Sequence, residues 1–251
     1  MFQITTTNPR FLKNTLTTIN TLIEEATFNI TPETIQLRAM DPSRVAMINL
    51  MIPKTNFDQY VCDEPTKLCI NITELQKLLK GAKTNETITL KLDPKTARLQ
   101  ITITGNYTRA FNMPTLEAAQ EEVPTPKVTF TVTAKLTTQG LNQAISDAQL
   151  VSDHVKIEAD NEKLTLNAKG DLMGANIELQ KGSDALLDLQ TTQQAKAIYS
   201  LSYLTDIIKA ASAASEIATL QFANDMPIKI DFQQQKEAKL TFYLAPRIEV
   251  E

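Results

Sequence analysis

The sequence predicts an α+β fold made of two tandem copies of one domain. Most of the chain alternates apolar and polar residues at period two and is rich in Ile, Val, Thr and Phe, as half-buried strands are. Four stretches instead place apolar residues three or four positions apart, which is the pattern of amphipathic helices. Both patterns recur when 129 is added to the residue number, and such a repeat is typical of a duplicated domain.

The first half of the chain is predicted to run strand, helix, strands, helix, strands. Its helices are expected over 8–25 and 72–83, and strands over 33–39, 86–92 and 97–104. Asn8 followed by Pro9 indicates the start of the first helix, because Asn caps a helix N-terminus and Pro suits the first helical position. Thr73 followed by Glu74 indicates the start of the second helix, and Gly81 indicates its end.

The second half is predicted to repeat this order. Its helices are expected over 135–151 and 201–215, and strands over 128–133, 162–168, 226–232 and 239–244. Thr137 or Thr138 would begin the first of these two helices, because a Thr hydroxyl caps the free N–H groups there.

The repeat keeps its register from the first helix of each half to the second. Adding 129 to Leu12, Leu37, Leu75 and Lys80 gives Leu141, Leu166, Leu204 and Lys209. Any two amphipathic β-rich halves would match apolar to apolar residues by chance in their strands. Here the helices match at the same offset as the strands, which favours a true duplication.

A proline-rich segment separates the two copies. Residues 114–127 show no sustained period and contain Pro114, Pro124 and Pro126. Proline fixes φ and removes a backbone donor, so this segment is expected to be an extended linker outside either sheet. The domains are therefore expected at 1–113 and 128–251.

Composition excludes several classes of protein. With 251 residues, 42% of them hydrophobic, the chain is long enough to bury a core. A net charge of −4 argues against indiscriminate coating of nucleic acid, although a basic surface can exist within an acidic total. No signal peptide or membrane span is evident, and the spacing of Cys62 and Cys69 matches neither a zinc pair nor a disulfide framework. A soluble intracellular protein is expected.

Catalytic chemistry is also not evident in the sequence. His154 is the only histidine and has no motif-linked nucleophile, and the chain has only six glycines and no phosphate-binding loop motif. Carboxylates near turns, such as Asp41, Asp171 and Asp225, are expected to cap those turns rather than bind a metal. We expect no catalytic residues, no metal and no cofactor.

Three motifs together carry a resemblance to a known family. They are "LRAMDPSRVAMINL" at 37–50, "DMPIKI" at 225–230 and "YLAPRIEVE" at 243–251. As a set they resemble the proliferating cell nuclear antigen family of DNA sliding clamps, and the archaeal members most. The resemblance extends over essentially the whole chain, because the duplicated domain, the linker position and two helices per copy also fit.

This resemblance implies a non-enzymatic ring of three subunits. Helices would line a hole that encircles double-stranded DNA without sequence preference, and antiparallel sheets would form the outer layer. The ring would tether DNA polymerase, the clamp loader, flap endonuclease, DNA ligase and other PIP-box proteins in replication and repair. It would work in the cytoplasm on the nucleoid if archaeal, and in the nucleus if eukaryotic.

Alternative roles remain open from sequence alone. A heterotrimer-only or checkpoint-type clamp subunit would keep the fold and scaffold repair proteins instead. A small-molecule enzyme on the same scaffold is a third possibility, for which no residues are evident. One sequence does not distinguish a homotrimer from a mixed ring.

Cations near the predicted helices are the candidate DNA contacts, because Lys and Arg on these faces would meet phosphates. They are Arg10, Lys13, Lys77, Lys80, Lys83, Lys135 and Lys209. The third helix departs from the family pattern, since Lys135 just before it is its only basic candidate and Asp147 would repel phosphate. Acidic residues gather in predicted loops, the linker and the tail, namely Asp63, Glu64, Glu117, Glu121, Glu122, Glu249 and Glu251.

Carried over by motif, the resemblance implies a partner pocket and two subunit-interface strands. The pocket residues are Met40, Arg44, Val45, Met47, Leu116, Val123, Met226, Pro227, Tyr243, Leu244, Ala245 and Pro246. Alternatively, Met40, Val45 and Leu244 would simply complete the domain cores. The interface strands lie at 106–112 and 175–181 and present Tyr107, Arg109, Phe111, Ala175, Ile177, Glu178 and Leu179, with Arg109 able to face Glu178 and Lys181 able to face a carboxylate.

Overall fold

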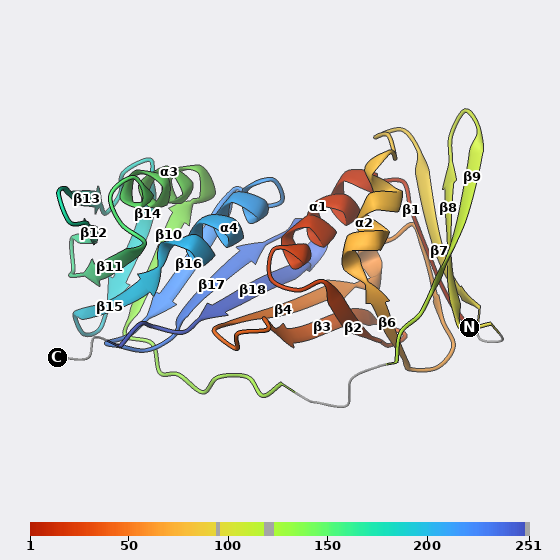
Figure 1. Cartoon of the computed structure of the whole chain (residues 1–251), viewed down its shortest axis with the longest axis horizontal. Helices are drawn as coiled ribbons and strands as arrows, with labels where there is room; N and C mark the ends of the chain where they lie inside the picture. Colours follow the sequence, from red (N-terminus) through yellow and green to blue (C-terminus); the bar gives the residue numbers. More distant parts are fainter. Residues whose placement is uncertain (94–95, 118–122, 249–251) are drawn as a thin grey trace. The chain divides into compact units, whose positions relative to one another are not determined.

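The computed structural model describes residues 1–93, 96–117 and 123–248 (Figure 1). Of the residues named above, Glu121, Glu122, Glu249 and Glu251 lie outside this part, as do 118–122 of the expected linker. The chain divides into two compact units. Unit 1 comprises Met1–Pro42, Ile48–Val123 and Gln234–Leu240, and unit 2 comprises Ser43–Met47, Pro124–Gln233 and Thr241–Glu251.

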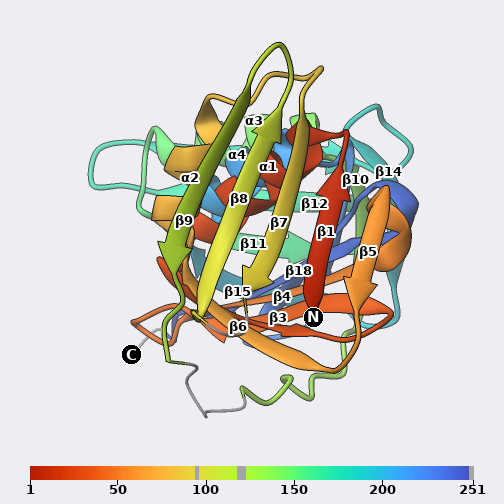
Figure 2. The same ribbon diagram turned by 90° about the vertical axis from the view of Figure 1, so that its right-hand side faces the viewer.

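Unit 1 contains two helices and two sheets. The helices are α1 (Pro9–Asn20) and α2 (Ile72–Lys80). A five-stranded antiparallel sheet has the order β5 (Gln59–Cys62), β1 (Phe2–Thr6), β7 (Thr87–Asp93), β8 (Arg98–Thr104), β9 (Thr108–Pro114), and Figure 2 looks onto it. The other strands are neighbours in the order β4 (Ala46–Pro53), β3 (Thr34–Met40), β2 (Glu25–Ile30), β6 (Thr66–Asn71).

Unit 2 has the same composition of elements. Its helices are α3 (Thr138–Gln149) and α4 (Leu201–Ser212). One sheet has the order β14 (Leu186–Thr191), β10 (Val132–Thr137), β16 (Ile217–Phe222), β17 (Ile228–Gln233), β18 (Lys239–Leu244). The second has the order β13 (Gly174–Gln180), β12 (Lys163–Lys169), β11 (His154–Ala159), β15 (Ala195–Ser200).

The duplication predicted from the sequence is confirmed by element bounds. Adding 129 to the bounds of α1, β2, β3 and β6 gives the bounds of α3, β11, β12 and β15 without any shift. The helix α4 also begins where the start of α2 maps, at Leu201. The predicted order of strands and helices in each half is therefore correct.

Helix starts follow their capping residues, with one correction. The Asn8 side chain accepts a hydrogen bond from the Phe11 N–H, and the Thr137 hydroxyl accepts one from the Gly140 N–H, as predicted. The predicted start of α2 at Thr73 is wrong, because Asn71 caps this helix by accepting from the Glu74 N–H. Gly81 follows the last helical residue, as expected.

The strand that enters unit 2 was predicted too early in the sequence. We expected a strand over 128–133 and a helix from 135, whereas β10 runs Val132–Thr137. Thr137 explains the shift: a residue that caps α3 with its side chain must itself be non-helical, so Lys135 and Leu136 before it continue the strand. Leu136 then pairs with Ala218 on β16 and is fully buried.

The core of each unit lies between its helices and its sheets. Leu12, Leu16 and Ile19 on α1 are buried, as are Leu141 and Ile145 on α3. Full burial of each such side chain contributes about 1.5–3 kcal/mol. The opposite face of every helix is thereby left for polar and charged residues. No helix in the described part of the chain is long and apolar enough to cross a membrane.

Candidate functional site

The exposed side of the unit 1 helices carries a cluster of cations. Arg10 is exposed in the first turn of α1, Lys77 and Lys80 are exposed in the last turn of α2, and Lys83 follows that helix. Leu75 and Leu79 on the same helix are buried, so the lysines of α2 lie on its solvent side. Cations at the C-terminal end of a helix also complement its dipole. We call Arg10, Lys13, Lys77, Lys80 and Lys83 the basic face of unit 1.

Lys13 has a different environment from the other four cations. Its Nζ donates to the Lys80 carbonyl at 3.2 Å and to the Ala82 carbonyl at 3.0 Å. These carbonyls lie at the C-terminal end of α2, where backbone C=O groups have no hydrogen-bond partner within the helix. Lys13 therefore holds the end of α2 against α1 and contributes its charge next to Lys80.

A cleft of about 410 Å³ lies between α1 and α2 and is lined by Lys13, Thr17, Thr73, Gln76, Lys77 and Lys80. Side-chain hydrogen bonds cross it. The Thr73 hydroxyl donates to Asn20 Oδ1 at 2.8 Å, Asn20 Nδ2 donates to Gln76 Oε1 at 3.1 Å, and Gln76 Nε2 donates to Thr17 Oγ1 at 2.8 Å. These bonds fix the distance between the helices and thus the spacing of their cations. Such a rigid, cationic surface suits phosphates.

An ion pair ties the turn after α2 to the edge strand β9. Glu86 is 5% exposed; its carboxylate accepts from the Lys83 N–H at 2.7 Å and from Arg109 Nη2 at 2.5 Å. Arg109 Nη1 also donates to the Gly81 carbonyl at 3.4 Å, and its guanidinium lies 5.0 Å from the Tyr107 ring centroid. The Lys83 N–H, followed by Arg109, lowers the pKa of Glu86 below its ordinary value, so this carboxylate is charged at neutral pH.

The helices of unit 2 lack most of these cations. Adding 129 to Arg10, Lys13, Lys77 and Lys83 gives Gln139, Asn142, Asp206 and Ser212, and only Lys80 has a cationic equivalent, Lys209. Lys209 is exposed on α4. On α3, Asp147 accepts a hydrogen bond from Gln143 Nε2 at 2.7 Å.

Lys135 is not on a helix face. It is exposed on β10, and its neighbours Ala134 and Leu136, which are fully buried, point to the opposite face of the strand. Since the buried face is the one that packs beneath the helices, the Lys135 ammonium lies on the outer side of the sheet. It is directly cross-strand from Asp188. The structure therefore does not bring Lys135 together with the cations on the helices.

The C-terminal corner, residues 243–246, forms part of unit 2 together with residues 43–47. The Ala245 N–H donates to the Val45 carbonyl at 2.9 Å, and Arg44 before it adopts a left-handed conformation with φ 57°. Met226 is 48% exposed, and its carbonyl accepts from the Tyr199 hydroxyl at 2.7 Å. Unit 2 thus brings the following predicted pocket residues into one substructure: Arg44, Val45, Met47, Met226, Pro227, Tyr243, Leu244, Ala245 and Pro246.

Three of these residues are inside the core rather than on its surface. Leu244 is 0% exposed, Met47 is 3% exposed and Tyr243 is 9% exposed. For Leu244 the alternative from the sequence, a core role, describes what is observed. These side chains support the corner from within the core, while Met226 offers apolar surface.

The remaining predicted pocket residues belong to unit 1. Met40 is 36% exposed at the end of β3. The Leu116 N–H donates to the Cys69 carbonyl at 2.8 Å, beside β6, and the Val123 carbonyl accepts from Arg38 Nη1 at 3.4 Å.

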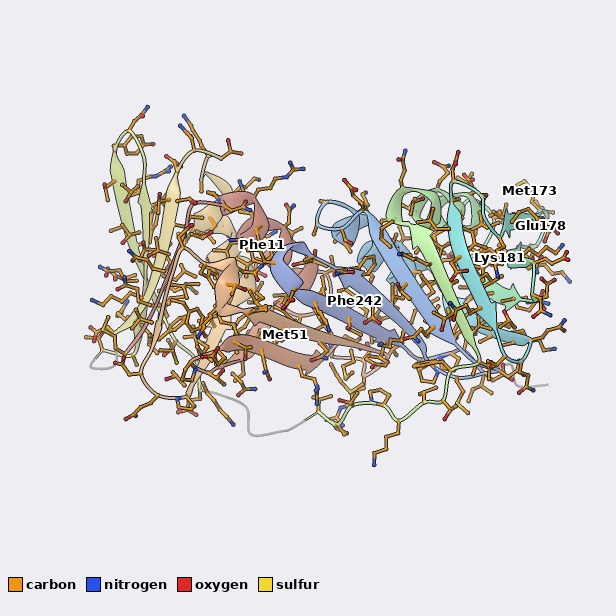
Figure 3. The ribbon with its side chains drawn as sticks, turned by 180° about the vertical axis from the view of Figure 1, so that it is seen from behind. Phe11, Met51, Met173, Glu178, Lys181 and Phe242 are labelled. Atoms are coloured by element: carbon orange, nitrogen blue, oxygen red, sulfur yellow. The ribbon has the colours of Figure 1, made fainter. Side chains whose placement is uncertain are left out.

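Strands β9 and β13, which contain the predicted subunit contacts, are each the last strand of a sheet. Figure 3 labels Glu178 on β13 and Met173 in the turn before it. The expected charge pairs are partnered within the chain: Glu178 lies 2.7 Å from Lys163, Lys181 lies 3.9 Å from Asp188, and Arg109 binds Glu86. Tyr107 is 62% exposed, and Ala175, Ile177 and Leu179 are half-buried along β13, as Phe111 is on β9.

Family models match nearly the whole chain. The N-terminal domain of proliferating cell nuclear antigen (PCNA) matches residues 1–121, and the C-terminal domain matches residues 124–247. The chain therefore belongs to the PCNA family.

Archaeal relatives match almost the whole chain. Relatives from Thermococcus gammatolerans and Pyrococcus furiosus, each named DNA polymerase sliding clamp, are 36% identical over 248 residues, which are 99% of this chain and 99% of each relative. The crystal structure of PCNA from Thermococcus kodakaraensis matches with a TM-score of 0.93 at 29% identity, covering 98% of this chain and 100% of that one. A chain of a PCNA2–PCNA3 complex from Sulfolobus tokodaii matches with a TM-score of 0.90 at 25% identity, with coverage of 98% and 100%. The predicted α+β fold with two tandem PCNA domains is confirmed.

Sequence reasoning missed Glu86 and the bonding role of Lys13. Glu86 was read only as the first residue of a strand, yet it is the partner of Arg109. The repeat held a signal, because adding 129 to Glu86 and Arg109 gives Ser215 and Ala238, so only one copy of the PCNA domain has both charges.

Proposed function

We propose that this chain is a DNA sliding clamp that encircles duplex DNA and tethers DNA polymerase and other enzymes to it. The observation that carries the proposal is the basic face of unit 1 on a chain with PCNA-family domains. The two relatives above, named DNA polymerase sliding clamp, support the same role. No residue is assigned a catalytic role, and no cofactor is assigned.

DNA contact would be made by phosphate neutralisation alone. The exposed ends of Arg10, Lys77, Lys80 and Lys83 meet phosphates in this proposal, while Lys13 mainly positions α2. Such contacts carry no sequence information and weaken steeply with salt. Weak, salt-sensitive contacts are what a ring needs if it is to move along the duplex.

The repeat supports ring closure through β9 and β13. In the 129-residue register β9 is equivalent to β18 and β13 is equivalent to β4. Within unit 2, the Ala245 N–H just after β18 donates to the Val45 carbonyl just before β4. A bond between β9 of one subunit and β13 of the next would reproduce this arrangement between chains, and repeating it three times would give the homotrimer that we propose. Apolar and main-chain contacts would provide most of the stability, because exposed ion pairs contribute only about 0–1 kcal/mol.

Partners would bind at the C-terminal corner. A PIP-box peptide from a polymerase, clamp loader, flap endonuclease or ligase would place its apolar anchors against Met226 and its neighbours, where a Met side chain adapts to different anchors. We retain Met40, Leu116 and Val123 as proposed contacts from unit 1, and 114–127 as the proposed linker between the domains. The expectation that this whole segment lies outside the sheets is wrong at its first residue, because Pro114 ends β9 and pairs with Arg98. An archaeal clamp of this kind would work in the cytoplasm, on the nucleoid.

A primer-extension assay on a long circular template tests the function. An archaeal polymerase that carries a PIP box should make longer products when this protein and a clamp loader are present. Unchanged product length in the presence of a loader active on another archaeal clamp would contradict the proposal.

Light scattering on the purified chain separates a homotrimer from a mixed ring. We expect the mass of a trimer. A monomer at micromolar concentration would favour a subunit that assembles only with related chains, and the PCNA2–PCNA3 complex from Sulfolobus tokodaii shows that unlike members of the family are found together.

A further inference from the structure

A groove lies on the outer face of the β13-β12-β11-β15 sheet. A groove of about 1190 Å³ there is lined by side chains that include His154, Lys156, Asn167, Lys169, Asn176 and Arg247. Val155 on β11 and Leu166 on β12 point the other way and are fully buried under α3 and α4. The groove is therefore on the side of this sheet away from the helices.

Strand register aligns the groove residues in a row. Lys156 on β11 is directly cross-strand from Asn167 on β12, which is cross-strand from Asn176 on β13. Side chains at such positions share one face and stand close together. The groove thus has a cation at one side and two amides along its floor. Asn167 Nδ2 already donates to Glu158 Oε2 at 2.7 Å and Asn176 Nδ2 to Glu178 Oε1 at 3.4 Å, so each amide keeps its oxygen and one N–H for a ligand.

Arg247 closes the groove at the C-terminal tail. The backbone N–H of Arg247 donates to the Ile198 carbonyl on β15 at 2.7 Å. This bond adds one main-chain hydrogen bond at the β15 edge of the sheet. Arg247 Nη1 donates to the His154 ring, 3.0 Å from Nδ1, and also contacts Nε2. Burial, followed by the Arg247 charge, lowers the pKa of His154, so the imidazole is neutral at neutral pH and accepts this bond.

Two cations of the groove have no carboxylate partner among the residues that the structure describes. Among the described residues, Lys169 and Arg247 take part in no ion pair, and the described lining of the groove contains no Asp or Glu. Lys156 does have a partner, Glu158 at 3.0 Å. A neighbouring groove of about 570 Å³ on the same sheet is different, because Glu158, Asp160 and Glu178 line it together with Lys163. Unpaired cations stand out on a chain with a net charge of −4.

We propose that this groove binds an acidic segment of a partner protein. Charge complementarity to Lys169 and Arg247 would supply the attraction, and the amide oxygens of Asn167 and Asn176 would accept from main-chain N–H groups of the segment. Ile198 and Ile248 add apolar lining, which a peptide with mixed acidic and apolar side chains satisfies and a sugar–phosphate backbone does not. The inference does not rest on DNA binding or on the PIP-box corner.

Fluorescence anisotropy with a labelled oligoglutamate peptide tests this site on the full chain. The double variant Lys169→Gln with Arg247→Gln should bind at least about tenfold more weakly, because two charge-assisted contacts are lost. The matched control is Lys67→Gln with Lys91→Gln, two exposed lysines of unit 1, which changes the net charge equally and should leave the affinity unchanged. Circular dichroism checks that both variants fold.

Several outcomes would overturn the proposal. Equal losses in the two double variants would mean that the peptide responds only to net charge, and no loss in either would mean that it binds elsewhere. Displacement of the peptide by single-stranded DNA, with DNA binding lost in the same Lys169/Arg247 variant, would make the ligand a nucleic acid. A PIP-box peptide serves as a second readout: its affinity should not change, so a failure here is distinguishable from a failure of the clamp function.

Discussion

The two units share one backbone plan but differ in which surface carries the interactions. Unit 1 places five cations on and beside its helices, and four of the equivalent positions in unit 2 are Gln, Asn, Asp and Ser. Unit 2 instead contains the C-terminal corner, where adding 129 connects Tyr243 and Leu244 with Pro114 and Thr115, residues of a different kind. A duplicated domain has thus diverged: one copy presents cations on and beside its helices, and the other presents the C-terminal corner.

The largest expected effect is a loss of stability when the buried side chain beneath the C-terminal corner of unit 2 is shortened. Leu244→Ala removes a fully buried side chain, and we expect the free energy of unfolding to fall by about 2–5 kcal/mol. Met226→Ala, at a side chain that is 48% exposed, should change it by no more than about 0.5 kcal/mol and yet weaken a PIP-box peptide. Denaturant titration and calorimetry measure the two effects. A Leu244→Ala protein as stable as the parent would contradict its core position.

The next effect concerns the basic face of unit 1. Replacing Arg10, Lys77, Lys80 and Lys83 by Gln should weaken binding to a short duplex by at least about tenfold, because each lost phosphate contact lowers the salt slope by about 0.9. Anisotropy at several salt concentrations measures both quantities. The control replaces four exposed lysines away from the helices by Gln, namely Lys67, Lys91, Lys127 and Lys196. The same loss in this control would show that net charge alone governs binding and would remove the assignment.

The order of strands and helices in the two units was predictable from the sequence, because side-chain periodicity and the 129-residue repeat determine it. The end of β10 and the start of α3 near Thr137 were not predictable. The Thr137 hydroxyl caps α3 and so decides where the strand ends and the helix begins, which the helix and strand propensities of these residues do not. The side of the strand on which Lys135 lies depends on pairing register, and its shift from an expected helix to β10 moved it to the outer face. Burial of Leu244 and the Glu86–Arg109 pair depend on contacts between segments distant in sequence, which periodicity does not encode.

A smaller effect distinguishes the units at acidic pH. In the folded protein the pKa of Glu86 is lowered below its ordinary value of 4.5. The Glu86 carboxylate therefore stabilises the fold at pH values above 4.5, and this stabilisation is lost as the pH falls through the lowered pKa. Glu86→Gln should therefore reduce stability at neutral pH and flatten the acid limb of the stability curve. Ser215→Ala, at the equivalent position in unit 2, should leave the acid limb unchanged. Thermal melts from neutral pH to below pH 4.5 measure the stability of both variants. If the stability of the parent and of Glu86→Gln fell in parallel with decreasing pH, the proposed role of the carboxylate would be refuted.

The smallest expected effect lies on α4, the one helix of unit 2 with a cation equivalent to the basic face. Lys209→Gln should lower the salt slope of duplex binding by no more than about 0.9, because it removes at most one phosphate contact per subunit. Asp206→Lys, which restores at the equivalent position the charge that Lys77 carries in unit 1, should change the slope in the opposite direction. Anisotropy with the same duplex measures both variants. A Lys209→Gln loss as large as that of the four-residue unit 1 variant would mean that the two units share the DNA contact equally, and the proposed division between them would then be wrong.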